Sequence, residues 1–410
     1  MRFLTRFSLA TLIASASVAQ AQPATVTALT HANVVDGVSA TVIRDATIVI
    51  RNGKIESVRA GGVVPAGATV IDVGGRYVAP GLIDAHTHIA TLANARRALF
   101  SGVTTVRSAS VPAFQDVAMR EQARAGQIVA PDVLATGVFV SPNLGETLLA
   151  DARLGVLAAG VTTPEQLRLL VRVNLDRGVD WIKTRGTERA GLPDTDPRKQ
   201  VYDERELRAI VEEAATRGIP VMAHAHGDEG AYAAVAAGAR SIEHGTYLSD
   251  STLRLMKLKG TWLVPTLSTI VDLTQPGGDY DDPVLLLRGQ HMAPRIEETI
   301  RRARALGVRI ATGADTDYGP ESVTRISHEV MRFAGLGFTA VEALASATSG
   351  AAELLGIATR TGRVAAGLEA DLIVLERNPL EDPGALQDVL IVVTDGRVVL
   401  NRLPFGRAPR

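Results

Sequence analysis

The sequence predicts an α/β protein: a (β/α)8 TIM-like barrel with a small β-sandwich domain built from both termini. Two patterns indicate this fold. In the middle of the chain, short apolar runs alternate about eight times with amphipathic helical patterns, as in a parallel barrel. The two ends carry β-hairpin patterns instead. The chain has 410 residues, of which 46% are hydrophobic, and this is enough for a barrel core and an accessory layer.

The composition narrows the classes of function. The formal net charge is −1 and no basic block is present, which argues against a nucleic-acid partner. The motifs described below predict a small-molecule substrate instead. The chain has no cysteine, so disulfides, thiolate metal sites and a cysteine nucleophile are excluded. It has eight histidines, and five of them fall in three short motifs. The sequence leaves open whether the protein forms a homo-oligomer.

The first 21 residues are predicted to be a secretory signal peptide. Arg2 and Arg6 form a short basic start, residues 7–18 are apolar and small, and Ala-Gln-Ala at residues 19–21 is a small-x-small cleavage site. The alternative is an N-terminal membrane anchor. We expect an exported protein, periplasmic or secreted, that has no membrane segment after cleavage.

Both ends of the mature chain are predicted to build the sandwich. In residues 22–78, an Asn-Gly pair at 52–53 joins two β-branched runs, which is typical of a hairpin. In residues 359–410, the pattern predicts a strand at 370–375 and a hairpin that turns at 394–397.

The barrel is predicted over residues 79–358. The expected helices include 204–217, 296–306 and 342–355. The alternative is an open doubly wound sheet, but no Gly-x-Gly-x-x-Gly follows the first strand, which weakens its dinucleotide-binding form. The expected strands are 82–89, 104–108, 133–140, 181–184, 221–226, 241–246, 262–267 and 308–312.

Histidines and one aspartate stand where these strands are expected to end. Residues two apart share a face of a strand, so each His-x-His pair presents two imidazoles together. The carboxyl ends of barrel strands converge on one face, where active sites form. Imidazoles and a carboxylate there suit zinc, although Mn, Co and Fe remain open. The residues are His86, His88, His224, His226, His244 and Asp315.

Lys183 lies at the end of the fourth expected strand. A lysine on an apolar strand is costly unless it is paired or chemically changed. The spacing alone does not separate a lysine that binds a substrate anion from a carboxylated lysine.

These motifs together resemble the amidohydrolase superfamily, in its binuclear branch with a carboxylated lysine. The resemblance covers nearly all of the mature chain and rests on residues 81–88 (GLIDAHTH), 102–107 (GVTTVR) and 362–375, together with the lysine, histidine and aspartate positions above. The pattern is similar to that of the prolidase-like and imidazolonepropionase-related group of dipeptidases and N-acyl amino acid hydrolases.

The resemblance implies two divalent metal ions, with zinc favoured, and six protein ligands. It implies that His226 contacts the substrate. In the alternative, His226 is the metal ligand and His224 lies deeper in the barrel. The implied ligands are His86, His88 and Asp315 for one ion, His224 and His244 for the other, and a carboxylated Lys183 that bridges both.

Three further residues are candidates for contact with the substrate. Arg185 lies two residues after Lys183 and could grip a carboxylate, or be a solvated loop arginine. Arg107, at the end of the second strand, could do the same or form a structural ion pair. Tyr247 could donate to a reacting oxygen or simply pack. The loop at 276–282 is expected to be either a lid or plain surface.

The implied function is an exported metal-dependent hydrolase that cleaves an amide bond in a dipeptide or an N-acyl amino acid. A hydroxide that bridges the two metals attacks the carbonyl, and Asp315 accepts the water's proton and passes it to the leaving group. The alternative keeps the metal site but changes the bond to a lactone, ester or phosphotriester, because fold does not decide chemistry. The third hypothesis is a non-enzymatic protein on the same scaffold that binds a metal or another ligand.

Overall fold

The computed structural model describes residues 25–403. The predicted signal peptide lies outside the described residues. Within them, no helix has both the length and the apolar character needed to cross a bilayer.

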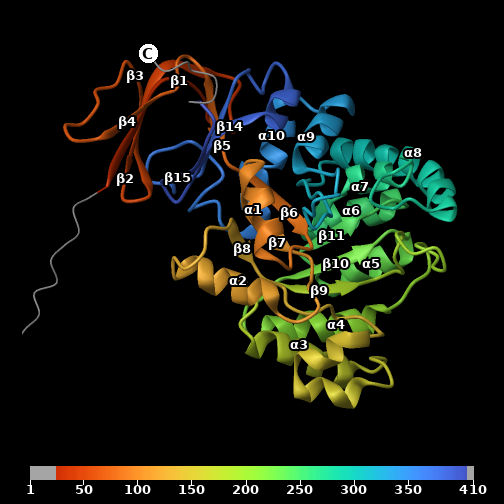
Figure 1. The fold of residues 1–410 in the computed structure, drawn as a ribbon. Helices are drawn as coiled ribbons and strands as arrows, with labels where there is room; N and C mark the ends of the chain where they lie inside the picture. Colours follow the sequence, from red (N-terminus) through yellow and green to blue (C-terminus); the bar gives the residue numbers. More distant parts are fainter. Residues whose placement is uncertain (1–24, 404–410) are drawn as a thin grey trace, which may run out of the picture.

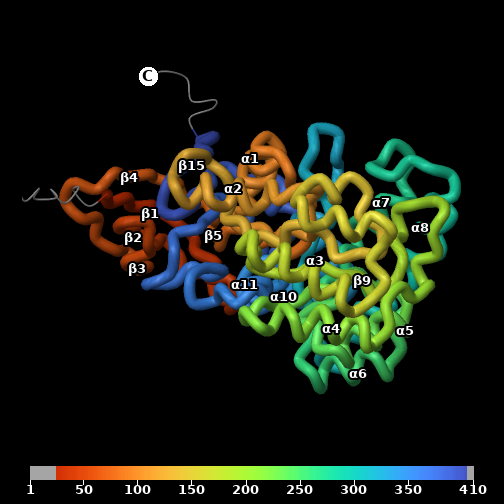
Figure 2. The backbone as a smooth tube through the Cα atoms, turned by 90° about the horizontal axis from the view of Figure 1, so that it is seen from below, coloured from red at the N-terminus to blue at the C-terminus, as the bar shows by residue number. Residues whose placement is uncertain are grey.

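Strands from both ends of the chain pair in one eight-stranded mixed sheet, seen beside the rest of the molecule in Figures 1 and 2. The order is β15-β14-β13-β5-β1-β2-β3, and β4 also pairs with β1. The antiparallel pairing of β5 with β13 joins the two ends. The division of this sheet into two facing layers stays a prediction. The strands are β1 (Val26–Val35), β2 (Val42–Arg51), β3 (Lys54–Ala60), β4 (Thr69–Asp72), β5 (Tyr77–Pro80), β13 (Leu372–Leu375), β14 (Val389–Thr394) and β15 (Arg397–Asn401).

Two hairpin turns meet in this sheet. Asn52 and Gly53 both have positive φ (52° and 83°), as a two-residue turn between β2 and β3 requires. Asp395 and Gly396 (49° and 73°) make the same turn between β14 and β15. A Cβ on Gly396 would lie 2.6 Å from the Cα of Gly53, so the contact of the two tips requires glycine.

The middle of the chain forms two parallel sheets, β6-β7-β8 and β9-β10-β11-β12. Backbone bonds link them at both seams: Val140 N donates to Lys183 O, and Leu263 N and Ala85 N donate to the segment 309–312. The strands are β6 (Leu82–Thr87), β7 (Val103–Ser108), β8 (Asp132–Leu134), β9 (Ile182–Arg185), β10 (Val221–Ala225), β11 (Ser241–His244) and β12 (Trp262–Val264).

Helices follow these strands and lie around them (Figure 1). α4 shows why they form: Asp203 and Glu206 make a capping box, and Leu207, Ile210 and Ala214 form its buried stripe. Three 3-10 helices cover 145–150, 152–157 and 383–387. The helices are α1 (Leu92–Phe100), α2 (Gln115–Arg124), α3 (Pro164–Asp176), α4 (Glu204–Ala215), α5 (Asp228–Ala237), α6 (Asp250–Lys259), α7 (Leu267–Asp272), α8 (Pro283–Leu306), α9 (Ile326–Gly335), α10 (Ala340–Ser346) and α11 (Ser349–Leu355).

The expected helix at 342–355 is wrong as a single element, because it is split into α10 and α11. Thr348 leaves the helical region (φ −139°, ψ −101°). The break frees two carbonyls for the parallel sheets: Ser346 O accepts from Thr312 N, and Ala347 O accepts from Ile83 N. Bonds to strands far away in the sequence therefore replace the bonds within the helix.

Several expected strands are also shorter than the pattern suggests, most of all 133–140, 262–267 and 308–312. In 262–267, β12 ends at Val264 and α7 begins at Leu267. In 133–140, β8 ends at Leu134 because Gly137 has a positive φ of 65° and its N–H donates to the Asp116 carboxylate. In 308–312, only Ile310 bridges to β12.

Candidate active site

Five imidazoles, one carboxylate and one amine line a single cavity of about 370 Å³. They lie in or just after β6, β9, β10 and β11, and Asp315 lies just after the segment that joins β12 to β6. The structure therefore brings together all six residues predicted as metal ligands, and His226 with them. The residues are His86, His88, Lys183, His224, His226, His244 and Asp315.

Each imidazole uses one ring nitrogen for a bond to the surrounding protein. The second nitrogens of His86 and His88 face Asp315, and those of the other three rings form no hydrogen bond among the described residues. Holding one nitrogen is how proteins orient metal-binding histidines. Four rings are held through Nδ1, and His224 is held through Nε2. The bonds are His86 Nδ1 to Glu243 Oε2 (2.7 Å), His88 Nδ1 to Ser110 O (3.0 Å), His226 Nδ1 to Thr246 Oγ1 (2.9 Å), His244 Nδ1 to Thr266 Oγ1 (2.7 Å) and His224 Nε2 to Glu188 O (3.0 Å).

Two groups of potential ligands share His244. His224, His226 and His244 offer nitrogens within 4.8 Å of one another, and His86, His244 and Asp315 form a second such group. Burial lowers the pKa of His224 and His244 well below the usual value, and that of His226 to about 3. These three rings are neutral at pH 7, and the neutral imidazole is the form that binds a metal.

Asp315 faces the imidazoles of the first strand. Its Oδ1 lies 3.3 Å from His86 Nε2 and 3.2 Å from His88 Nε2. Burial raises the pKa of Asp315, but the facing histidines outweigh it and hold that pKa well below its usual range. The residue has a φ of 50°, a left-handed conformation that asparagine and aspartate tolerate better than most residues.

Asp84 holds the segment before Asp315 against β6. Its Oδ1 accepts from the backbone N–H groups of His86 and Ala314, and its Oδ2 accepts from the Tyr318 hydroxyl at 2.8 Å. Burial raises the pKa of Asp84 to about 6. Asp84 therefore holds the backbone of the candidate metal ligands His86 and Asp315 in place, and its own side chain does not line the cavity.

Lys183 is only 2% exposed, and its Nζ lies 3.4 Å from His86 Nε2. Burial is the main cause that lowers the pKa of this amine to about 8. About one tenth of the Lys183 amine is therefore uncharged at pH 7, and only the uncharged amine is a nucleophile.

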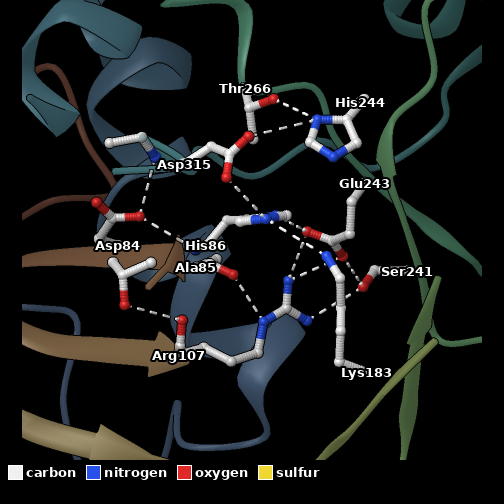
Figure 3. A network of polar contacts seen from close by, with 12 residues as sticks. Asp84, Ala85, His86, Arg107, Lys183, Ser241, Glu243, His244, Thr266 and Asp315 are labelled. Atoms are coloured by element: carbon white, nitrogen blue, oxygen red, sulfur yellow. Dashed lines mark hydrogen bonds and ion pairs between the residues drawn. The ribbon is translucent and has the colours of Figure 1, made fainter. Parts of the chain in front are cut away.

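A buried network of charged side chains, whose partners the sequence does not identify, lies behind His86 (Figure 3). Glu243 accepts from His86, and Arg107 Nη2 donates to both of its carboxylate oxygens at 2.9 and 3.0 Å. Arg107 Nε donates to Ala85 O, and its guanidinium lies over the Trp181 ring at 4.6 Å. Burial raises the pKa of Glu243, but Arg107 and His86 outweigh it and bring that pKa down to about 2.

Arg107 is therefore corrected as a candidate for contact with the substrate. Its side chain is 0% exposed, its donors point to Glu243, Ser241 and Ala85, and it does not line the cavity. The structure shows the alternative interpretation of Arg107, a structural ion pair. The only sequence feature that pointed to Glu243 as the partner of Arg107 is its position directly before His244 in the strand.

Tyr247 is corrected in the same way. It does not line the cavity, and its ring packs 6.0 Å from that of His291. Arg185, in contrast, lines the cavity as predicted. Tyr280, from the predicted loop at 276–282, also lines the cavity, and it contacts Gly191, where a Cβ would lie 2.8 Å from its ring.

Comparisons with known proteins find relatives of this chain in sequence and in structure. A model described as "Amidohydrolase family" matches residues 77–399. Ochratoxinase of Aspergillus niger is 33% identical over 284 residues, covering 64% of this chain and 58% of that protein, so the match spans less than two thirds of that relative. Imidazolonepropionase of a Polaromonas species is 26% identical over 417 residues, covering 88% of this chain and 91% of that protein. A crystal structure of a Xaa-Pro dipeptidase with bound methionine aligns with a TM-score of 0.82 and 27% identity, covering 92% of this chain and all of that one.

Proposed function

The chain belongs to the amidohydrolase family, and from that premise we propose that it is an exported, metal-dependent hydrolase that cleaves the amide bond of a dipeptide or an N-acyl amino acid. The observation that carries the proposal is one cavity lined both by the imidazole and carboxylate cluster and by Arg185. The relatives named ochratoxinase and Xaa-Pro dipeptidase support amide hydrolysis.

The proposal takes the two parallel sheets as one (β/α)8 barrel and the terminal sheet as the β-sandwich domain. The backbone bonds at both seams of the parallel sheets support the barrel. In a barrel the strand ends meet at one face, and this accounts for the convergence of the ligands. The composition of residues 1–21 supports export to the periplasm or the medium.

Two zinc ions are the proposed cofactors, and the residues fit them. His224, His226 and His244 are buried, neutral imidazoles with one nitrogen bonded and one free, and such rings are the usual ligands of zinc. When bound, two such ions lower the pKa of a shared water and polarise the scissile carbonyl. His86, His88 and Asp315 would hold one ion, His224 and His244 the other, and a carboxylated Lys183 both.

The chain's own groups supply the proton transfer and the orientation of the substrate. The Asp315 carboxylate is ionised and lies beside the imidazole cluster, so it can accept a proton from the attacking water and deliver it to the departing amine nitrogen. Arg185 can bind the substrate carboxylate through two parallel hydrogen bonds. A guanidinium in the cavity favours carboxylate-bearing amides over the lactone, ester and phosphotriester alternatives.

Carboxylation of Lys183 is supported by its environment. The amine is buried, has a lowered pKa and lies beside His86. Its uncharged form can add to carbon dioxide, and the resulting carbamate would exchange a buried amine for a negative ligand.

The test is amine release from a panel of dipeptides and N-acyl amino acids by the zinc-loaded mature protein. We expect release with the wild-type protein and with Lys259→Ala, which changes an exposed lysine on α6. We expect a loss of about 10³-fold or more with Lys183→Ala, because a shared ligand would be removed. Release that is unchanged in Lys183→Ala would refute the proposed site.

A second prediction separates the two histidines of β10. His224→Asn is expected to bind one zinc ion fewer per chain, because it removes a ligand. His226→Asn is expected to keep both ions and to lose activity by about 10²-fold, as for a group that contacts substrate. Elemental analysis together with kcat/KM checks both. If the ion is lost from the His226→Asn protein and kept in His224→Asn, His226 is the ligand.

A further inference from the structure

Two guanidinium groups line the wall that the active-site cavity shares with a neighbouring cavity. The second cavity has a volume of about 530 Å³. Both cavities are lined by Ser141, Asn143, Arg185 and Arg189, so these four residues stand where the cavities meet. The arginines come from β9 and from the loop that follows it, four residues apart.

Arg185 has hydrogen-bonding capacity to spare. Its Nε is buried and has no hydrogen-bond partner among the described residues. The ring of Phe139 lies 4.5 Å from the centre of its guanidinium. A guanidinium stacked on a ring keeps its edge free for a planar, bidentate partner such as a carboxylate.

Arg189 also lacks a protein counterion. Its side chain is exposed, and none of the hydrogen bonds or ion pairs of the described residues involves its guanidinium. The adjacent Glu188 is already engaged: its Oε1 accepts from Lys199 Nζ at 2.7 Å, and its Oε2 accepts from Asp196 N at 2.9 Å. The carboxylate of the main cavity, Asp315, faces His86 and His88 instead.

Arg185 and Arg189 line the same two cavities, so their positive charges stand at one wall. Glu188 also lines the second cavity, but neither arginine forms an ion pair with a carboxylate among the described residues. Two like charges at one wall are stabilised when anions bind between or beside them. One monocarboxylate neutralises one of the two charges.

We propose that the two arginines recognise a dicarboxylate leaving group, so that the preferred substrate is an amide of aspartate or glutamate. Arg185 binds the α-carboxylate and Arg189 the side-chain carboxylate. Water adds to the acyl carbon, the C–N bond breaks, and the nitrogen takes up a proton to leave as the free acidic amino acid. This inference rests on the proposed function, because it names the substrate class of the same site.

The test compares N-acetyl-glutamate with N-acetyl-glutamine, which differ in one charge and hardly in shape. We expect the wild-type kcat/KM to be at least about tenfold higher for the glutamate compound, as for a charge-assisted pair. Arg189→Gln should bring this ratio close to one. The matched control is Arg198→Gln on the same loop, whose guanidinium is already paired with Asp196 at 3.0 Å and which should keep the wild-type ratio. Equal rates on both compounds, or an equal loss on both in Arg189→Gln, would overturn the proposal.

A binding measurement separates this inference from the proposed function. Calorimetry with glutarate and with butyrate, on the zinc-loaded protein, does not depend on turnover. We expect glutarate to bind at least about tenfold more tightly than butyrate, and Arg189→Gln to remove the difference. If no amide is cleaved but this difference is found, the proposed function fails and the dicarboxylate site stands. Equal affinities for the two acids would rule the site out.

Discussion

Replacing Asp315 by asparagine is expected to lower kcat/KM for amide hydrolysis by about 10³-fold or more. The substitution keeps the size of the side chain and suits the left-handed backbone at this position (φ 50°), so the fold should not change. It removes the negative charge that faces His86 and His88 at 3.3 and 3.2 Å. An amide oxygen is a weaker zinc ligand, and it cannot carry a proton from the water to the leaving nitrogen.

The measurement is kcat/KM together with zinc content and melting temperature. The matched control is Asp317→Asn: Asp317 is exposed, lies two residues away and bonds to Asn94 and the Gly319 backbone outside the cavity. We expect this control to retain wild-type activity. An Asp315→Asn protein that held two zinc ions and kept activity within a fewfold of wild type would show that Asp315 does not transfer the proton.

Replacing Arg107 by methionine is expected to cost about 3 to 5 kcal/mol of unfolding free energy. Arg107 and Glu243 are both 0% exposed, so the substitution leaves a carboxylate buried and without its cation. Methionine fills part of the volume but offers no donor to Glu243, Ser241 or the Ala85 carbonyl. The double variant Arg107→Met with Glu243→Gln should recover most of this loss, because it removes the stranded charge.

Urea denaturation of the single and double variants checks this expectation. The control is Arg208→Met, whose i,i+4 pair with Glu204 on α4 is about half exposed and should cost less than about 1 kcal/mol. A stability of Arg107→Met equal to that of Arg208→Met would contradict the prediction. Because Glu243 also orients His86, Glu243→Gln alone should weaken zinc binding by about 10- to 100-fold in a metal titration.

The histidine pairs of the candidate site could be predicted from the sequence because strand geometry makes each pair local. Residues two apart share a face, so His86 with His88 and His224 with His226 are paired by sequence alone. Each motif ends a strand of a parallel pattern, and strand ends of that pattern meet at one edge. Which of His224 and His226 would bind the metal was open in the sequence, and both rings lie in the same group of three in the structure.

The elements that the sequence mispredicted are those that distant backbone groups interrupt. The apolar period continues through 342–355, but the carbonyls of Ser346 and Ala347 accept hydrogen bonds from Thr312 and from Ile83 of β6, and the helix breaks there. In 133–140, the turn at Gly137 depends on a bond to Asp116, 21 residues away. The local periodicity of hydrophobic residues contains no information on such distant partners.

The sequence by itself determined the strand and helix alternation, the hairpins of both ends and the residue types at each strand end, because all of these follow from local periodicity and turn chemistry. Only the tertiary structure decided the partners of the buried charges. Arg107 and Glu243 are 136 residues apart, and no local rule pairs them. His244 shows the same limit: neighbours on a strand normally point to opposite faces, but its φ of 74° turns its ring so that both it and Glu243 reach His86. A charge in a dry interior is stable only beside its counterion, so packing, and not sequence position, selects which arginine supports the Glu243–His86 pair and which one lines the cavity.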